Sequence, residues 1–259
     1  MTDTYTSLIA NLDIKRESLI KGVQMEGWKK YKRSLFEFLD FYLANDIDEI
    51  IVMDAMASLY DQPIGSEVVD RIAKNSSIPI GIGGGIKTVS DADRLFDLGA
   101  DRIIVNTHIT RRPDFLTELA ERFGCQSIIA RVDCKRNHAS GWAVLTENGR
   151  TVTKLGALDW ITSLCSLGAG EVIIHSVDRD GTLKGPDLGL ARAMIPSVDI
   201  PVVMSGGISS VEQISQLINI GVRGVAIGKA LHEDILKITD LKNELIQSKA
   251  RIRPGKVRS

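Results

Sequence analysis

Short apolar runs rich in Ile and Val recur along the chain, and each is followed by a longer segment in which apolar residues return every three or four positions. The short runs predict β-strands, and the longer segments predict amphipathic helices. We expect eight strands, at residues 8–12, 49–54, 78–82, 102–106, 127–133, 171–176, 200–204 and 224–228. We expect helices at residues 35–45, 68–74, 89–98, 115–123, 158–167, 190–194, 211–220 and 241–249.

This alternation predicts an α/β fold with a parallel sheet. The strand runs are continuously apolar, which is typical of strands that are buried on both faces. Eight strand and helix pairs in 259 residues match the size of a (β/α)8 TIM barrel, and no linker-like segment divides the chain. We therefore expect one barrel domain over residues 1–259, with an open doubly wound sheet as the structural alternative.

An internal repeat favours the barrel over the open sheet. Residues 78–106 align without gaps on residues 200–228, and the four-residue segments that begin at Leu12 and Val132 also correspond. Self-similarity at a fixed spacing is the mark of a repeated structural unit. We expect two related half-barrels, at about 1–122 and 123–245, followed by a basic tail at 249–259 that frays in solvent.

Composition narrows the possible partners. Lys and Arg number 32 against 33 Asp and Glu, a net charge of -1, so no overall basic field exists to hold a nucleic acid. No run approaches the roughly 20 apolar residues that cross a bilayer, and the first seven residues are polar, so we expect a cytoplasmic protein without a membrane partner. The three cysteines lack metal-ligand spacing, and we expect neither a metal nor an organic cofactor.

Two repeated carboxylates are the first candidates for chemistry. Asp13 ends the first predicted strand and Asp133 the fifth, and the active site of a barrel lies at the C-terminal ends of its strands. Two carboxylates that face each other can divide acid and base work when their surroundings separate their pKa values. The alternative is that each Asp only caps the segment that follows it. Their correspondence across the repeat favours catalysis.

Glycine-rich segments follow the third and seventh predicted strands. Glycine lets backbone N–H groups approach a phosphate closely, although tight turns use glycine as well. Two equivalent copies predict two phosphate sites and a ligand phosphorylated at both ends. The residues expected at one site are Gly84, Gly85, Asn106 and Thr107, and those at the other are Ser205, Gly206, Gly207, Gly228 and Lys229.

Two further segments have open interpretations. Asp180 and Gly181 follow the sixth strand, where they can form a ligand-binding loop or a solvated turn. His175, near the end of that strand, can touch substrate or pack beneath the loop. The basic run at 29–33 is short, so we interpret it as a first loop that reaches over an anionic substrate rather than as a nucleic-acid site.

With these residues assembled, the chain resembles the cyclase subunit of imidazole glycerol phosphate synthase. The resemblance runs from about residue 9 to residue 242, and its most specific pieces are LDIK, DEIIVMD, GGGIKTVSDA, GADRIIVNT, VDCKR, GAGEVIIHSVDRDGT and SGGI. It implies an enzyme that uses ammonia from a separate glutaminase subunit to split and cyclise a bisphosphorylated formimino-aminoimidazole ribonucleotide. The products are imidazole glycerol phosphate and an aminoimidazole carboxamide ribotide.

The resemblance also implies roles for residues. Asp13 and Asp133 match the acid/base pair of the family, and the two glycine segments match its phosphate sites. Charged residues at the opposite end of the barrel match the point where ammonia enters from the glutaminase: Glu49, Arg102 and Glu171. The family's basic residue in the first strand is replaced by Ser7, which predicts an incomplete charged ring.

Other departures keep alternative functions open. Asn11, His175 and the pair Gly228 and Lys229 differ from the usual cyclase residues, and the first loop lacks the family's Gly-Asp-Pro segment. The altered first loop, together with Ser7 and Lys229, suggests a relative that passes ammonia to another acceptor, such as a surface-polysaccharide sugar. The segments GTLKGPD and GKALHE resemble the sister isomerase of the same pathway, which needs no ammonia. A barrel kept only as a docking partner is the non-enzyme alternative.

Overall fold

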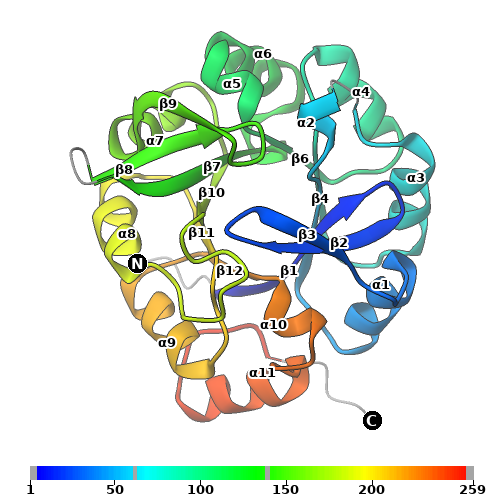
Figure 1. Cartoon of the computed structure of the whole chain (residues 1–259), viewed down its shortest axis with the longest axis vertical. Helices are drawn as coiled ribbons and strands as arrows, with labels where there is room; N and C mark the ends of the chain where they lie inside the picture. The colour runs from blue at the N-terminus through cyan, green and yellow to red at the C-terminus, as the bar shows by residue number, and fades with distance from the viewer. Residues whose placement is uncertain (1–4, 61–62, 138–140, 255–259) are drawn as a thin grey trace.

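The computed structural model describes residues 5–60, 63–137 and 141–254. Within these residues, parallel strands close into a barrel that a ring of helices surrounds (Figure 1). Around the barrel the strands are β1 (Ser7–Lys15), β4 (Glu49–Asp54), β5 (Ile80–Gly83), β6 (Arg102–Val105), β7 (Ile128–Asn137), β10 (Glu171–Ser176), β11 (Val202–Ser205) and β12 (Gly224–Ile227). Because β12 pairs with β1 and β10 with β7, the eight parallel strands form a closed ring, and the predicted (β/α)8 barrel is confirmed.

The long helices occupy the predicted positions to within a few residues. They are α1 (Leu35–Ala44), α3 (Ser66–Asn75), α4 (Val89–Asp97), α6 (Asp114–Phe123), α7 (Ala157–Ser166), α8 (Leu188–Met194), α9 (Val211–Ile220) and α11 (Ile238–Gln247). The sequence analysis missed the shorter elements because one helical turn shows no periodicity: α2 (Ala57–Tyr60), α5 (Thr107–Arg111), α10 (Lys229–His232) and the 3-10 turns at Cys125–Ser127 and Ile195–Ser197.

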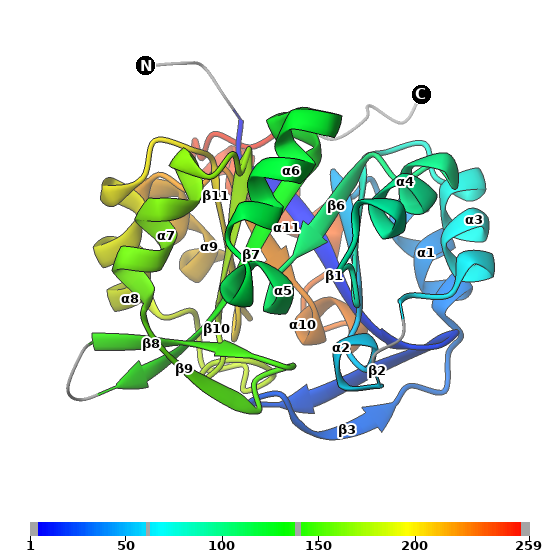
Figure 2. The ribbon, with the colours of Figure 1, turned by 90° about the horizontal axis from the view of Figure 1, so that it is seen from above.

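Two antiparallel hairpins lie at the same end of the barrel (Figure 2). They are formed by β2 (Ser18–Val23) with β3 (Glu26–Lys30), and by β8 (Gly141–Thr146) with β9 (Thr151–Gly156). The first loop, which we expect to reach over an anionic substrate, thus contains a hairpin that was not predicted from the sequence. Gln24 and Met25 both adopt positive φ, at 55° and 61°, and such a two-residue turn matches the twist of paired strands.

The interior of the barrel is arranged in layers. Residues alternate between the two faces of a strand, so every second residue points inward. Charged side chains begin β4, β6 and β10 at the bottom of the barrel, an apolar layer lies above them, and polar side chains follow at the mouth. The apolar layer consists of Ile9, Ile51, Ile104, Ile129, Ile173, Val203 and Ala226, with Met53 packed against it.

The C-terminal segment is more ordered than the sequence predicted. Ile252 forms a parallel bridge with Thr6 and is 2% exposed, and the amide of Thr6 donates to the carbonyl of Arg251 at 2.7 Å. The apolar side chain is thus removed from water, which explains why this part of the basic tail does not fray. The end of the predicted tail, from residue 255, lies outside the described residues.

No helix in the described ranges is long and apolar enough to cross a membrane. The cytoplasmic location stays a prediction.

A buried ion pair attaches the last helix to the bottom of the barrel. Lys242 on α11 donates to Asp48 Oδ1 at 2.8 Å, and Asp48 Oδ2 accepts the amide of Leu8 at 2.9 Å. Both charged side chains are buried. Removal of one partner leaves the other charge without compensation inside the protein, which is far costlier than the loss of an exposed pair.

We therefore expect Lys242→Met to lower the free energy of unfolding by about 3 kcal/mol. The control is Lys74→Met, which removes the exposed pair between Lys74 and Asp70 on α3 and is expected to cost at most about 0.5 kcal/mol. Urea unfolding of the two variants and the wild type measures both values. Equal losses in the two variants would contradict a special role for the buried pair.

Candidate active site

Asp13 and Asp133 lie opposite each other at the mouth of the barrel. Asp13 belongs to β1 and Asp133 to β7, and both side chains are buried. Asp13 stands four positions after Ile9 on β1, and Asp133 stands four positions after Ile129 on β7. Because side chains alternate along a strand, the two residues of each pair point inward together. The alternation of the strands thus brings the two predicted carboxylates into one space above the apolar layer.

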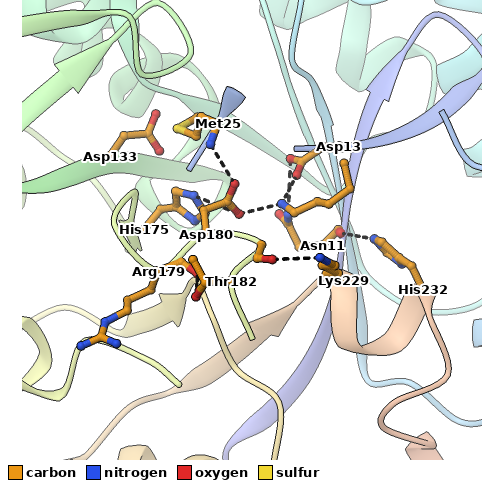
Figure 3. Close-up of polar contacts among 12 residues, drawn as sticks. Asn11, Asp13, Met25, Asp133, His175, Arg179, Asp180, Thr182, Lys229 and His232 are labelled. Atoms are coloured by element: carbon orange, nitrogen blue, oxygen red, sulfur yellow. Dashed lines mark hydrogen bonds and ion pairs between the residues drawn. The ribbon is translucent and has the colours of Figure 1, made fainter. Parts of the chain in front are cut away.

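Lys21 is the counter-ion of Asp13. This side chain reaches from β2 and contacts Asp13 Oδ2 at 2.6 Å and Asp180 Oδ1 at 2.7 Å, with all three residues buried (Figure 3). Burial alone would raise the pKa of Asp13, but the charges of Lys21 and Arg131 outweigh it and hold that pKa below its ordinary value. Asp13 is therefore ionised in the ligand-free protein at neutral pH.

Asp133 has its own pair of donors. Arg131 Nε donates to Asp133 Oδ1 at 2.9 Å, and Asn106 Nδ2 donates to Asp133 Oδ2 at 2.8 Å. Arg131 stands two residues before Asp133 on β7, so both side chains face the interior. Among the described residues, no group accepts a hydrogen bond from Arg131 Nη1. Each carboxylate is thus oriented by a different cation.

His175 lies at the end of β10 beside Asp180. The distance between His175 Nε2 and Asp180 Oδ1 is 3.6 Å, and the ring is buried (Figure 3). Burial and the nearby charge of Arg131 lower the pKa of His175 to about 4, so the ring is neutral at pH 7. Its position beneath the loop fits the packing interpretation, and contact with substrate stays a prediction.

The two glycine segments adopt matching conformations. Gly84 and Gly85 have φ values of 127° and 70°, and Gly206 and Gly207 have values of 110° and 80°. A Cβ atom on Gly206 would lie 2.6 Å from the carbonyl oxygen of Ser176, so the close approach of the backbone requires glycine. This agreement supports the repeat, while the division into half-barrels stays an interpretation.

The predicted phosphate-binding residues gather in two pockets at the mouth. One pocket is lined by Gly84, Gly85, Asn106 and Thr107, together with Lys87, His108 and Arg111. The other is lined by Asp180, Gly181, Ser205, Gly206, Gly207, Gly228 and Lys229, together with Lys21. Lys229 Nζ donates to the carbonyl of Gly181 at 3.1 Å, which joins the loop after β10 to the segment after β12 (Figure 3). Each pocket thus combines glycine backbone with cationic side chains, as phosphate ligands require.

The opposite end of the barrel carries a charged ring. Arg102 pairs with Glu49, and its Nη1 atom contacts Glu171 Oε1 at 3.1 Å. Arg223, which precedes β12, donates to Ser7 Oγ at 2.6 Å and contacts Glu49 Oε1 at 3.2 Å. Burial alone would raise the pKa of Glu49. The charges of the two arginines and the hydrogen bond with Ser7 outweigh burial and lower that pKa, so Glu49 is ionised.

At Ser7, where the family's basic residue is missing, the structure places the side chain of Arg223. Ser7 is a small hydroxyl residue. Arg223, which directly precedes the neighbouring strand β12, lies beside it and supplies a basic group. The expected gap was inferred from β1 alone, the strand that contains Ser7. In a closed barrel, the first and last strands are neighbours, so a charge can come from either.

Three functional candidates were missed from the sequence: Lys21, Arg131 and Arg223. Arg131 left the clearest signal, since a charged residue interrupts an apolar strand at an inward-facing position two residues before Asp133. Lys21 left a weaker one, because its position depends on the unpredicted hairpin. Arg223 could be found only from the pairing of β12 with β1.

The opposed carboxylates and the paired glycine loops place the chain among (β/α)8-barrel enzymes whose sites open at the C-terminal ends of the strands. More particularly, the chain belongs to the histidine biosynthesis protein family, whose sequence profile matches residues 7–237.

Three relatives are similar over most of their length, and each is named imidazole glycerol phosphate synthase subunit HisF. The protein of Legionella pneumophila is 42% identical over 80% of this chain and 97% of its own length. That of Myxococcus xanthus is 36% identical over 95% of this chain and 97% of its own. That of Synechococcus sp. (strain CC9605) is 34% identical over 95% and 98%, respectively. The resemblance noted from the sequence is confirmed.

The ion pairs of Lys21 lead to a prediction about pH. Asp13 in the wild type has a pKa below the model-compound value of 3.8, so its ionised form stabilises the fold above that pH, and this contribution is lost as the pH falls. Without Lys21, we expect burial to outweigh the remaining charge of Arg131 and to raise the pKa of Asp13. The contribution of Asp13 is then present at low pH and lost as the pH rises.

We expect Lys21→Met to destabilise the fold by about 3 kcal/mol at pH 7 and by clearly less near pH 4. Lys30→Met is the matched control, because Lys30 is exposed on the same hairpin and its loss changes no buried pair. Urea unfolding at both pH values measures the difference. A loss that is the same at pH 4 and pH 7 would contradict the assignment.

Proposed function

We propose that the protein catalyses the reaction of the synthase subunit after which its relatives are named. It uses ammonia to split and cyclise a bisphosphorylated formimino-aminoimidazole ribonucleotide, which yields imidazole glycerol phosphate and an aminoimidazole carboxamide ribotide. The observation that carries this proposal is the position of Asp13 and Asp133 between two glycine-lined, cationic pockets. A ligand with a phosphate at each end can bind both pockets and present its central atoms to both carboxylates.

The surroundings of the two carboxylates suggest a division of work. The reaction must take protons from the incoming ammonia and give one to the nitrogen that leaves. Lys21 remains protonated because Asp13 and Asp180 raise its pKa despite burial, and it lies 2.6 Å from Asp13. We assign to this pair the proton that the leaving nitrogen gains: it passes from Lys21 through the adjacent carboxylate of Asp13, and Lys21 is reprotonated from solvent. Asp133 is the base that receives protons from ammonia.

Substitution of each carboxylate tests this role. Asp13→Asn and Asp133→Asn keep the shape of the side chain but remove its capacity to transfer a proton in either direction. We expect kcat with ammonium salt to fall by at least about 100-fold in each variant. The measurement is the disappearance of the formimino ribonucleotide, with an ammonia-free reaction as the control.

Other outcomes of the same assay distinguish the alternative functions. Turnover without ammonia would indicate the isomerase. Binding of the bisphosphate ligand without any turnover would indicate a barrel that serves another ammonia acceptor, and unchanged activity in both Asn variants would leave only a docking role.

We further propose that ammonia comes from a separate glutaminase subunit, which docks at the bottom of the barrel in a heterodimer. The charged ring formed by Glu49, Arg102, Glu171 and Arg223 lies at that end, and the apolar layer above it leads to the carboxylates. Neutral ammonia can cross an apolar layer at much lower cost than a charged ion.

Arg223 allows this proposal to be tested separately from the chemistry. Arg223→Met removes its contacts with Ser7 and Glu49 at the bottom, far from the mouth. With a glutaminase subunit of imidazole glycerol phosphate synthase present, we expect glutamine-dependent turnover to fall at least about 10-fold, the equivalent of roughly 1.4 kcal/mol. Turnover driven by ammonium salt is the internal control and should stay within about twofold. Equal losses in the two assays would contradict a role in ammonia transfer.

A further inference from the structure

Arg131 is a buried cation whose hydrogen bonds are incomplete. It lies on β7 between Ile129 of the apolar layer and Asp133, and its side chain is 4% exposed. Its Nε atom donates to Asp133, and its Nη1 atom has no acceptor among the described residues. A guanidinium group carries five N–H donors, and a buried donor without an acceptor costs free energy. The protein thus keeps an unpaired donor inside its site.

Pairing with Asp133 alone does not explain this residue. Asn106 already donates to the other oxygen of Asp133, and the charge of Arg131 also acts on Asp13 and Asp180. The side chain is therefore in contact with one carboxylate and close enough to two others for their charges to raise its pKa. It also lines the pocket that contains Gly84 and Gly85, so it borders the space available to a ligand. An acceptor supplied by the ligand would complete its hydrogen bonds.

The position of Arg131 relative to the layers indicates which ligand atom it meets. The residue stands directly above the apolar layer, where ammonia would reach the mouth, and beside the carboxylate that we assign as the base. When ammonia adds to a carbonyl carbon, its lone pair forms the new N–C bond and the C=O π pair moves to oxygen. One proton leaves the nitrogen and the oxygen later gains one, so the product is a neutral carbinolamine.

We propose that Arg131 is a further catalytic residue that donates from Nη1 to the carbonyl oxygen of the substrate and stabilises its negative charge during this addition. The inference rests on the proposed function. Fixed N–H donors directed at a developing oxyanion accelerate such steps strongly, because they need no rearrangement as the charge forms. The proton that Asp133 removes comes from the ammonia nitrogen in the same addition. Asp133 thus acts on the nitrogen and Arg131 on the carbonyl oxygen.

Three substitutions test the role of Arg131 with ammonium salt as nitrogen source. We expect Arg131→Met to lower kcat about 100-fold, with the dissociation constant of the formimino ribonucleotide changed by less than about threefold. Arg131→Lys keeps the charge but not the planar arrangement of N–H donors, and we expect it to retain only part of the wild-type kcat. Because it keeps a buried cation, it shows whether a loss in Arg131→Met is due to misfolding. In Arg131→Ala, added guanidinium ion should restore part of the rate. Arg192→Met, which removes an exposed guanidinium on α8, is the control and should match the wild type.

The outcomes separate this inference from the proposed function. No turnover by the wild type would overturn the proposed function, and the role of Arg131 with it. Wild-type turnover with an unchanged kcat in Arg131→Met, or a loss only in substrate affinity, would overturn the role of Arg131 alone. A residue that only orients Asp133 would have no further effect in an Asp133→Asn background. A further fall in the residual rate of that double variant is the result we expect.

Discussion

Closure of the parallel strands forces the inward-facing side chains of the whole chain into one narrow space. Because the faces of a strand alternate, each strand can place one residue at the bottom, one in the middle and one or two at the mouth. On β7, Ile129 belongs to the apolar layer in the middle, and Arg131 and Asp133 follow toward the mouth; on β1, Ile9 belongs to that layer, and Asn11 and Asp13 follow. A shift of one residue in the register of either strand would turn a carboxylate outward toward the helices. The geometry of the site therefore depends on the register in which the strands pair when the barrel closes.

The two carboxylates at the mouth, Asp13 and Asp133, pair with cations from different parts of the chain. Lys21 comes from a hairpin that folds over the barrel, and it joins β1 to the loop after β10 through Asp13 and Asp180. Asp180 also accepts the amide of Met25, so the hairpin and that loop are held together by more than one contact. Arg131, in contrast, belongs to the same strand as its partner Asp133. The cation beside Asp13 thus depends on the placement of a hairpin, whereas the cation beside Asp133 is fixed by its own strand.

The sequence was sufficient to predict the barrel, the order of its strands and the location of both carboxylates. These features depend on apolar runs and on the end of each run, which are local signals. The β2 and β3 hairpin was not predictable in this way, because it depends on positive φ values at Gln24 and Met25, residues with no special preference for them. Arg223 was missed for another reason, since its role arises from the contact of two strands more than 200 residues apart.

The apolar layer across the middle of the barrel has a consequence for protons. Transfer of hydronium, hydroxide or ammonium through seven packed aliphatic side chains would require each ion to lose its water, which is expensive. The layer thus works as a filter for charge as well as a packed core. If ammonia enters from the bottom, as we propose, it crosses this layer as the neutral molecule and brings no additional proton to the carboxylates at the mouth.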